Sequence, residues 1–342
     1  MSLKNLSVKI RIPKSLKNKL KNRRIKEIYN EFEKSFDVEN NFAVAVSGGP
    51  DSLALAFLAK IYSYNKKLSP KFFIIDHKLR PESTIEARNV KKILKNFFIT
   101  SEILTWRGKK PRKNIQSQAR NERYKLLFKR CDQFNIKNIL LGHHSDDLFE
   151  NFFIRMLRGS GLKGLISFDK ETQIGKMNLL RPLLFQKKED LVFLSKFVFN
   201  FYVQDSSNDD EKYQRINIRK LIARLKKNGL DNSKFFKTIE NLKYSNQVVE
   251  FYTKENLKKN TFFSIKDNKL ILNDRFFLQP YEVVFRSLSD SIKLIGQMYY
   301  SVRGKKLDKI IKDMGNNKSF RATLGGCIIE KVNQTVIISK ES

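Results

Sequence analysis

Short apolar runs alternate along the chain with longer stretches of mixed polarity. Each run has the length and the residue types of a strand, and the predicted strands cover residues 42–46, 71–75, 99–106 and 138–141. The stretches between them have helical length and composition, and the predicted helices cover residues 53–60, 83–96 and 115–135. Strands and helices that alternate at this pitch predict an α/β fold with a doubly wound parallel sheet.

The segments on either side of this pattern have a different composition. Residues 1–40 form a basic N-terminal extension with a helix predicted over about 16–36, which is either an arm that contacts phosphates or a solvated cap on the sheet. After Gly229 the pattern predicts a helix at 232–260, a strand pair around 262–272, a helix at about 280–300 and a β-hairpin built from 320–330 and 334–339. No motif in this last part carries chemistry. We therefore divide the chain into regions 1–40, 41–228 and 229–342.

A short loop, Ser47-Gly48-Gly49-Pro50-Asp51-Ser52, joins the first strand to its helix. The glycines allow a sharp turn that directs backbone amides at one point, where the helix adds free N–H groups and the positive end of its dipole. Such a nest binds an anion, and Ser47 and Ser52 add hydroxyl donors. Asp51 would repel a phosphate, so it indicates either a bridging Mg²⁺ or a part in the chemistry. The alternative is an ordinary strand–helix turn that Asp51 caps.

Polar residues also follow the second and the fourth predicted strands. The segment 76–80, DHKLR, comes where open α/β sheets place their ligands, and STIE at 83–86 has the pattern of a capping box. The segment 142–147, GHHSDD, runs into a helix with one apolar face, formed by Leu148, Phe149, Phe152, Phe153, Met156 and Leu157. The polar residues that share the opposite face at helical spacing are Asp147, Asn151, Arg155 and Arg158.

Three carboxylates gather at the start of this helix, because Glu150 lies one turn from Asp146 and Asp147. They could complement the helix dipole, bind a metal ion or hold an amine. His143 and His144 lack the i, i+4 spacing of a zinc-binding helix. We therefore expect the two histidines to pack beside a nucleotide.

Composition narrows the class of protein. The chain has 342 residues, enough for two or three domains, and its 41% hydrophobic content with 28 Phe can fill real cores. Its 68 Lys and Arg against 35 Asp and Glu give a net charge of +33, which attracts polyanions, and nucleic acid is the first candidate. A proteome rich in lysine is the alternative source of this excess.

Cysteine and apolar patterns bear on the compartment. Cys131 and Cys327 lie far apart and form neither a disulfide framework nor a CxxC pair. No apolar run reaches the roughly 18 residues of a membrane span. The N-terminal residues lack the apolar core of about 7–15 residues that a signal peptide contains. We expect a cytoplasmic protein without membrane contact.

Several of these segments resemble known families. The loop SGGPDS resembles the SGGxDS loop of the PP-loop ATP pyrophosphatases, which cleave ATP to AMP and pyrophosphate. HHSDD at 143–147, with Glu150, resembles the HHxDDxxE segment of the tRNA(Ile)-lysidine synthetase family. Further blocks similar to that family follow in its order: DHKLR at 76–80, Asn114, Gln116, Ala119-Arg120 and Arg123-Tyr124, RGSGL at 158–162 with Gly164, RPLL at 181–184, and DSSNDD at 205–210 with Tyr213, Arg215 and Arg219. Ser206 replaces the family's usual Pro, which removes turn rigidity but no functional group.

The resemblance, which covers about residues 42–219, implies an enzyme that acts on tRNA with ATP and Mg²⁺. It would adenylate the C2 oxygen of the wobble cytidine in the CAU anticodon of an isoleucine tRNA, releasing pyrophosphate. The ε-amine of free L-lysine would then displace AMP and leave lysidine. The region 229–342 resembles the C-terminal appendages of this family and would dock tRNA, and the basic loop at 107–113 is either a solvated connector or a contact to the tRNA backbone.

Roles of single residues are implied by matched position. The loop 47–52 would bind ATP, and Asp51 would also hold Mg²⁺. Asp147 and Glu150 would bind the lysine amine and position it. Asn208 and Arg219 would hold the activated cytidine or the lysine, with Arg215 nearby. The alternative for the two arginines is that they belong to a basic helix face.

Other functions fit the sequence less well. PP-loop thiolases that act on tRNA need cysteines for sulfur or for an iron–sulfur cluster, and this chain has two lone cysteines. Amidotransferase-type relatives such as GMP or NAD synthetases would not need a charge of +33. A non-catalytic RNA-binding protein on the same scaffold would be expected to lose the carboxylates at positions 51, 147 and 150, and these are present.

Overall fold

The computed structural model describes residues 12–78, 80–108, 115–203, 214–264, 268–298, 302–317 and 319–341. The chain divides into two compact units, Met1–Asn232 and Ser233–Ser342. Most of the basic loop at 107–113 and the segment 205–210 lie outside the described residues, so the predictions made for them have no structural counterpart. No helix among the described residues is both long enough and apolar enough to cross a membrane.

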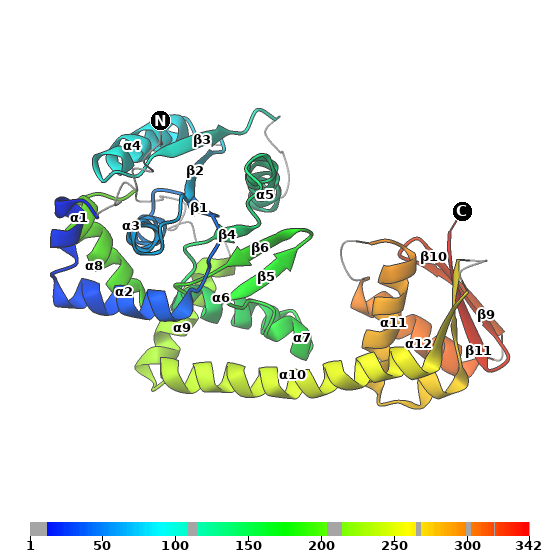
Figure 1. Ribbon diagram of the computed structural model, residues 1–342. Helices are drawn as coiled ribbons and strands as arrows, with labels where there is room; N and C mark the ends of the chain where they lie inside the picture. Colours follow the sequence, from blue (N-terminus) through cyan, green and yellow to red (C-terminus); the bar gives the residue numbers. More distant parts are fainter. Residues whose placement is uncertain are drawn as a thin grey trace, which may run out of the picture. The chain divides into compact units, whose positions relative to one another are not determined.

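Unit 1 alternates strands and helices (Figure 1). Its elements are α1 (Lys14–Lys19), α2 (Arg23–Ser35), β1 (Phe42–Val46), α3 (Pro50–Lys66), β2 (Lys71–Asp76), α4 (Ser83–Asn96), β3 (Ser101–Thr105), α5 (Ile115–Gln133), β4 (Asn138–Leu140), α6 (Ser145–Leu157), α7 (Leu162–Leu165), β5 (Glu171–Ile174), β6 (Met177–Leu180), α8 (Lys188–Phe199) and α9 (Gln214–Lys227). The helix α10 (Asn232–Asn260) starts at the boundary between the units.

The six strands of unit 1 form one sheet in the order β3-β2-β1-β4-β6-β5. All neighbours are parallel except β5, which pairs antiparallel with β6 at the edge. The chain builds outwards from β1 to β2 and β3, then returns to the other side of β1 for β4. This reversal beside β1 makes the sheet doubly wound and confirms the predicted fold class.

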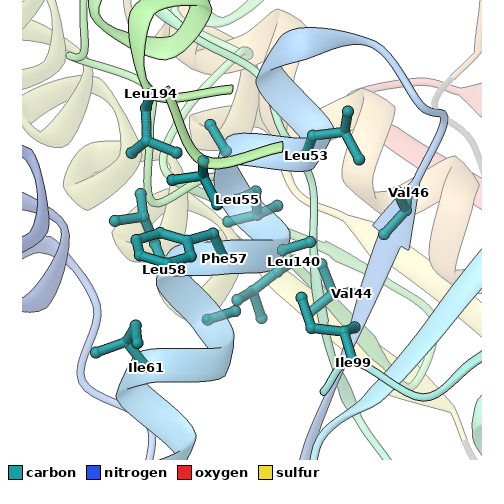
Figure 2. Packing of buried hydrophobic residues seen from close by; sticks show 14 of the residues in the cluster. Val44, Val46, Leu53, Leu55, Phe57, Leu58, Ile61, Ile99, Leu140 and Leu194 are labelled. Atoms are coloured by element: carbon teal, nitrogen blue, oxygen red, sulfur yellow. The ribbon is translucent and has the colours of Figure 1, made fainter. Parts of the chain in front are cut away.

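Side chains alternate between the two faces of the sheet, as the period of a strand requires. Val44 and Val46 of β1 pack with α3, α4 and α8, whereas Ala43 packs with Leu127 of α5 on the other face. Figure 1 shows α5 on the opposite side of the sheet from α3, α4 and α8. In Figure 2, side chains of α3 lie between Leu194 of α8 and the strand residues. The result is a three-layer α/β/α unit.

The helix α3 is buried nearly all round, which explains its composition. Pro50 occupies its first turn, where a missing N–H costs nothing, and small or branched apolar residues follow on every face. Leu53 to Ala59 are all fully buried. A helix packed this tightly fixes the loop at its N-terminus relative to the sheet.

Unit 2 contains nearly all of α10, the helices α11 and α12, and a five-stranded antiparallel sheet in the order β7-β8-β11-β10-β9. Its further elements are β7 (Thr261–Ser264), β8 (Lys269–Leu272), a 3₁₀ helix (Asp274–Leu278), α11 (Tyr281–Ile295), α12 (Gly304–Asn316), β9 (Ser319–Leu324), β10 (Cys327–Val332) and β11 (Thr335–Lys340). One face of the sheet and the apolar stripes of α11 and α12 share a core that includes Leu288, Leu307 and Ile338.

The structure corrects three predictions about helices. The helix expected over 16–36 is two helices, because Asn22 caps a new one by accepting a hydrogen bond from the Ile25 amide at 3.2 Å. The capping box predicted at 83–86 is absent, since Ser83 is the first helical residue and donates to Asp76 instead. The helix expected to reach residue 300 ends at Ile295.

Other differences concern apolar faces and strands. The apolar face of α6 is buried at Leu148 and Phe149, but Met156 and Leu157 at its end are exposed. The segment expected as one strand at 320–330 is two strands, because Gly325 and Gly326 both have positive φ and form a tight turn between β9 and β10. The pattern did not predict the strands β5 and β6 or the helices α8 and α12.

Candidate functional site

The site lies where β1 and β4 run side by side. The two strands are parallel neighbours, so their carboxyl ends open at the same edge of the sheet. The loop 47–49 follows β1 and the segment 141–144 follows β4. Open α/β sheets bind ligands at such a reversal of strand order. The two polar segments singled out in the sequence therefore meet.

The loop after β1 is ordered by its own hydroxyl groups. Ser52 Oγ accepts hydrogen bonds from the amides of Ser47 and Gly48, each at 3.1 Å, and donates to the Gly49 carbonyl at 2.9 Å. Ser52 is buried beneath the loop and does not reach the cavity, whereas Ser47 lines it. Gly48 has φ +88°, a conformation that few L-residues adopt. Val203 closes the loop from the other side through its amide and the Gly48 carbonyl, at 2.9 Å.

A cavity of about 620 Å³ opens at this point of unit 1. One wall is the anion nest, and the other wall is formed by the carboxylates of α6 and the side chains of α9. The lining residues are Ser47, Gly49, Pro50, Asp51, His144, Asp146, Asp147, Glu150, Lys188, Val203, Arg219, Ile222, Ala223 and Lys226. A volume of this size is sufficient for a nucleotide.

Each of three carboxylates on the cavity wall has a cationic partner from another element. Lys188 Nζ lies 2.7 Å from Asp51 Oδ1 and 2.6 Å from Asp51 Oδ2. Lys226 of α9 pairs with Asp146 at 2.8 Å. Arg219, also on α9, pairs with the buried carboxylate of Glu150. These ion pairs hold α9 against α6 and α8 against the loop.

Asp147 and His144 cap the start of α6 reciprocally. The His144 amide donates to Asp147 Oδ2 at 2.9 Å, and His144 Nδ1 accepts from the Asp146 amide at 3.2 Å. His144 Nε2 then lies 3.7 Å from Asp51 and 3.6 Å from Asp147. Burial alone would raise the pKa of Asp147, but the nearby histidines, the His144 amide and Lys188 outweigh it and lower that pKa. Asp147 is therefore a stable anion in the cavity.

The residues after β2 have a structural part. Asp76 is buried and accepts from the Lys78 amide at 3.0 Å, from Ser83 at 2.9 Å and from Thr84 at 2.7 Å. These bonds outweigh the effect of burial and lower the pKa of Asp76. Burial, with the charge of Arg123 adding to it, lowers the pKa of His77 to about 4. Among the described residues, none accepts or donates a hydrogen bond at His77 Nδ1.

The structure brings most of the predicted site residues together. Ser47, Gly49, Pro50, Asp51, Asp147, Glu150 and Arg219 all line the cavity, while Gly48 and Ser52 shape the loop behind it. Asn208 and the side chain of Arg215 lie outside the described residues. Sequence reasoning missed Lys188 and Lys226, which carry no motif of their own. The only sequence signal for Lys188 is its place shortly after the RPLL block.

The donor set at Asp51 suits a magnesium ion that arrives with a nucleotide. Proteins bind Mg²⁺ through one or two carboxylates together with substrate phosphates. Asp51 stands beside the nest, and both of its oxygens already face a cation, the Lys188 ammonium. Among the described residues, no group of three or more His, Cys, Asp or Glu is arranged to bind a metal ion alone. A single carboxylate next to a phosphate cradle fits a Mg²⁺ site that the protein completes together with the phosphates of its substrate.

Comparison with known proteins assigns the family. The PP-loop domain family matches residues 17–225. A tRNA(Ile)-lysidine synthase of Wolbachia sp. subsp. Brugia malayi is 32% identical over 324 residues, covering 93% of this chain and 75% of the relative. One of Orientia tsutsugamushi is 33% identical over 324 residues, covering 90% of this chain and 71% of the relative. The chain belongs to the tRNA(Ile)-lysidine synthase family.

Members of the tRNA(Ile)-lysidine synthase family are enzymes. The cavity lies within the part of the chain that matches the PP-loop domain family. The matched residues include every lining residue of the cavity except Lys226. A solved structure with the same fold is the U34-tRNA thiolase NcsA from Methanococcus maripaludis, described with its [4Fe-4S] cluster. It has a TM-score of 0.56 and 16% identity, covering 65% of this chain and 78% of the other.

We expect Gly48→Ala to destabilise the loop and to weaken ATP binding. An alanine Cβ there would lie 2.6 Å from Val90 Cγ2 and 2.9 Å from Val203 Cγ2. The positive φ adds a cost of roughly 1–2 kcal/mol for any other L-residue. Urea unfolding and calorimetric titration with ATP measure the two effects. Gly161→Ala is the control, because its φ is −68° and no atom of a neighbouring residue lies within 4 Å of the added Cβ. Equal effects of the two changes would contradict the special role of Gly48 in the loop.

His77 should make the protein less stable as the pH falls from about 6.5 to 4. In this window the unfolded chain binds a proton at His77 and the folded chain does not, because the folded pKa of about 4 lies below the unfolded value of 6.5. The loss amounts to at most about 3 kcal/mol at 1.36 kcal/mol per pH unit. Urea unfolding at several pH values should give a flatter profile for His77→Gln than for the wild type. Parallel profiles would show that His77 is solvated.

Proposed function

We propose that this protein joins free L-lysine to C2 of the wobble cytidine in the CAU anticodon of an isoleucine tRNA. In this reaction ATP transfers its adenylyl group to the C2 oxygen and releases pyrophosphate. The ε-amine of lysine then attacks C2, AMP departs, and lysidine remains. Family membership supports tRNA lysidine formation, and the arrangement of the cavity supports this two-step form of it.

The observation that carries the proposal is that one cavity combines a phosphate nest with a cluster of carboxylates. The nest at 47–51 suits the phosphates of ATP, and the carboxylates of α6 suit an ammonium group. A reaction that needs only ATP hydrolysis has no use for the second feature. A ligation that joins an amine to an ATP-activated group uses both.

The nest serves the first step. The first turn of α3 supplies backbone N–H groups that have no partner within the helix, and its dipole favours negative charge. These donors would stabilise the charge that develops on the departing pyrophosphate. Asp51 would hold Mg²⁺, which when bound neutralises phosphate charge and makes pyrophosphate a better leaving group.

The carboxylates serve the second step. Asp147 would bind the lysine amine, since its lowered pKa keeps it ionised and makes it an anchor more than a proton acceptor. Glu150 would help to position the same amine from one turn further along α6. The amine must lose a proton before it attacks, because an ammonium has no free electron pair. Arg219 and Asn208 would hold the activated cytidine or the lysine, with Arg215 nearby.

The rest of the chain would bind tRNA. We assign 41–228 to catalysis and 229–342 to tRNA docking, with the basic extension 1–40 as a third region. The net charge of +33 supports contact with a polyanion, and its effect should weaken with salt. We place the reaction in the cytoplasm, where tRNA, ATP and free lysine meet.

A thiolase is the nearest alternative, since the protein of similar fold, NcsA, is a U34-tRNA thiolase with a [4Fe-4S] cluster. Such clusters are held by several cysteine thiolates. This chain has Cys131 and Cys327, and each is buried in the core of its own unit. Burial raises the pKa of Cys131 to about 12, so its thiol is a poor ligand and a poor nucleophile.

We expect the protein to incorporate labelled lysine into a CAU-anticodon isoleucine tRNA transcript in the presence of ATP and Mg²⁺. Asp51→Asn and Asp147→Asn should each lower the rate by about 100-fold or more, because each removes a charge that the transition states require. Asp132→Asn, on the exposed face of α5, should keep the wild-type rate.

The elongator methionine tRNA, which shares the anticodon, is the substrate control and should receive no lysine. Release of AMP with another tRNA but without lysine transfer would keep the PP-loop chemistry and overturn the substrate. If neither lysine transfer nor AMP release is detected, the protein is an RNA-binding protein without this activity.

A further inference from the structure

The ammonium of Lys188 is paired with Asp51, the carboxylate that would hold Mg²⁺. It contacts both carboxylate oxygens, at 2.7 and 2.6 Å, from the first residue of α8. The Asp51 side chain is only 22% exposed. Lys188 lines the same cavity as the nest residues Ser47 and Gly49.

The position of Lys188 is imposed by packing. Leu191 and Leu194 of α8 are fully buried in the core that also contains α3. Ser195 Oγ donates to the Pro50 carbonyl, which ties α8 directly to the first turn of α3. The backbone of residue 188 is therefore held beside the loop, and its side chain reaches the cavity from there.

A lysine at this place is unfavourable for α8 itself. The N-terminus of a helix carries partial positive charge and favours acidic residues, and Glu189 and Asp190 in the same turn follow that rule. Lys188 opposes the rule, and its ion pair with Asp51 offsets the cost. The side chain is thus held by direct contact with Asp51 and by attraction to the charge of Asp147, and it is repelled by its own helix.

We propose that Lys188 is a positioning residue that exchanges partners when nucleotide binds. Without nucleotide it neutralises Asp51 and keeps the carboxylate beside the nest. A metal ion on Asp51 and the ammonium cannot share the same two oxygens, so the ammonium is released towards the phosphates at the neighbouring nest. There it contacts the phosphate chain and the departing pyrophosphate. This role rests on the proposed function of Asp51 and of the nest.

Lys188→Met tests the exchange, because methionine keeps the length of the side chain and removes its charge. Two titrations without tRNA or lysine are needed: Mn²⁺ alone, followed by paramagnetic resonance, and pyrophosphate with Mg²⁺, followed by calorimetry. Loss of the competing ammonium should tighten Mn²⁺ binding by about tenfold, and loss of a phosphate contact should weaken pyrophosphate binding by about tenfold. A merely structural role would not move the two affinities in opposite directions.

Two further variants complete the test. Lys187→Met removes the exposed neighbouring lysine and should leave both affinities at wild-type values. Lys188→Arg keeps the charge and should retain pyrophosphate binding within a few-fold. If Lys188→Met does not fold, this variant still tests whether a cation at position 188 supports pyrophosphate binding.

Wild-type affinities for both ligands in Lys188→Met would overturn the exchange and leave the proposed function intact. Weaker binding of both ligands would also overturn it, since Lys188 would then only support the loop. A wild-type protein that binds neither Mn²⁺ nor pyrophosphate would instead contradict the proposed nest and Asp51 site.

Discussion

The parallel pairing of β1 with β4 is the constraint on which the site depends. Because the chain turns back at β1, the loop after one strand and the helix start after the other are forced to the same edge of the sheet. The buried helix α3 then fixes the loop, and the reciprocal cap of His144 and Asp147 fixes the start of α6. Neither segment could form the cavity without the strand order beneath it.

Charge pairing then determines how the outer elements attach to this centre. The helix α9 carries Ile218 and Ile222 into the unit, but its cationic side chains Arg219 and Lys226 are directed to carboxylates of α6. Partly buried pairs of this kind are costly to break by removal of one partner, since the other charge is left without compensation. A ligand that replaces such a partner must therefore bring a charge of the same sign. In the proposed reaction this requirement would select an ammonium at α6 and a metal ion at Asp51.

The sequence predicted the alternating strands and helices that indicate a doubly wound sheet, the loop after β1 and the carboxylates of α6, because each of these patterns depends on residues close together in the chain. It missed Lys188 and Lys226, whose partners Asp51 and Asp146 are distant in sequence and are reached only through packing. The capping box at Ser83 failed for a related reason. The residues 83–86 could start the helix after Ser83, with Ser83 as the cap, or at Ser83 itself. The hydrogen bond from Ser83 to Asp76 favours the second, in which Ser83 is already helical.

The cavity separates charge although the protein as a whole is strongly basic. Its nest side offers amides and a helix dipole to anions, and its α6 side offers Asp146, Asp147 and Glu150 to cations. An unbroken positive surface would draw the phosphates of ATP and tRNA but would repel an ammonium. Because α6 gathers carboxylates within one turn, the same cavity presents a cation-binding wall beside the nest. The proposed reaction joins a cationic amine to a group activated by an anionic nucleotide and would require this local inversion, which the helix start after β4 provides.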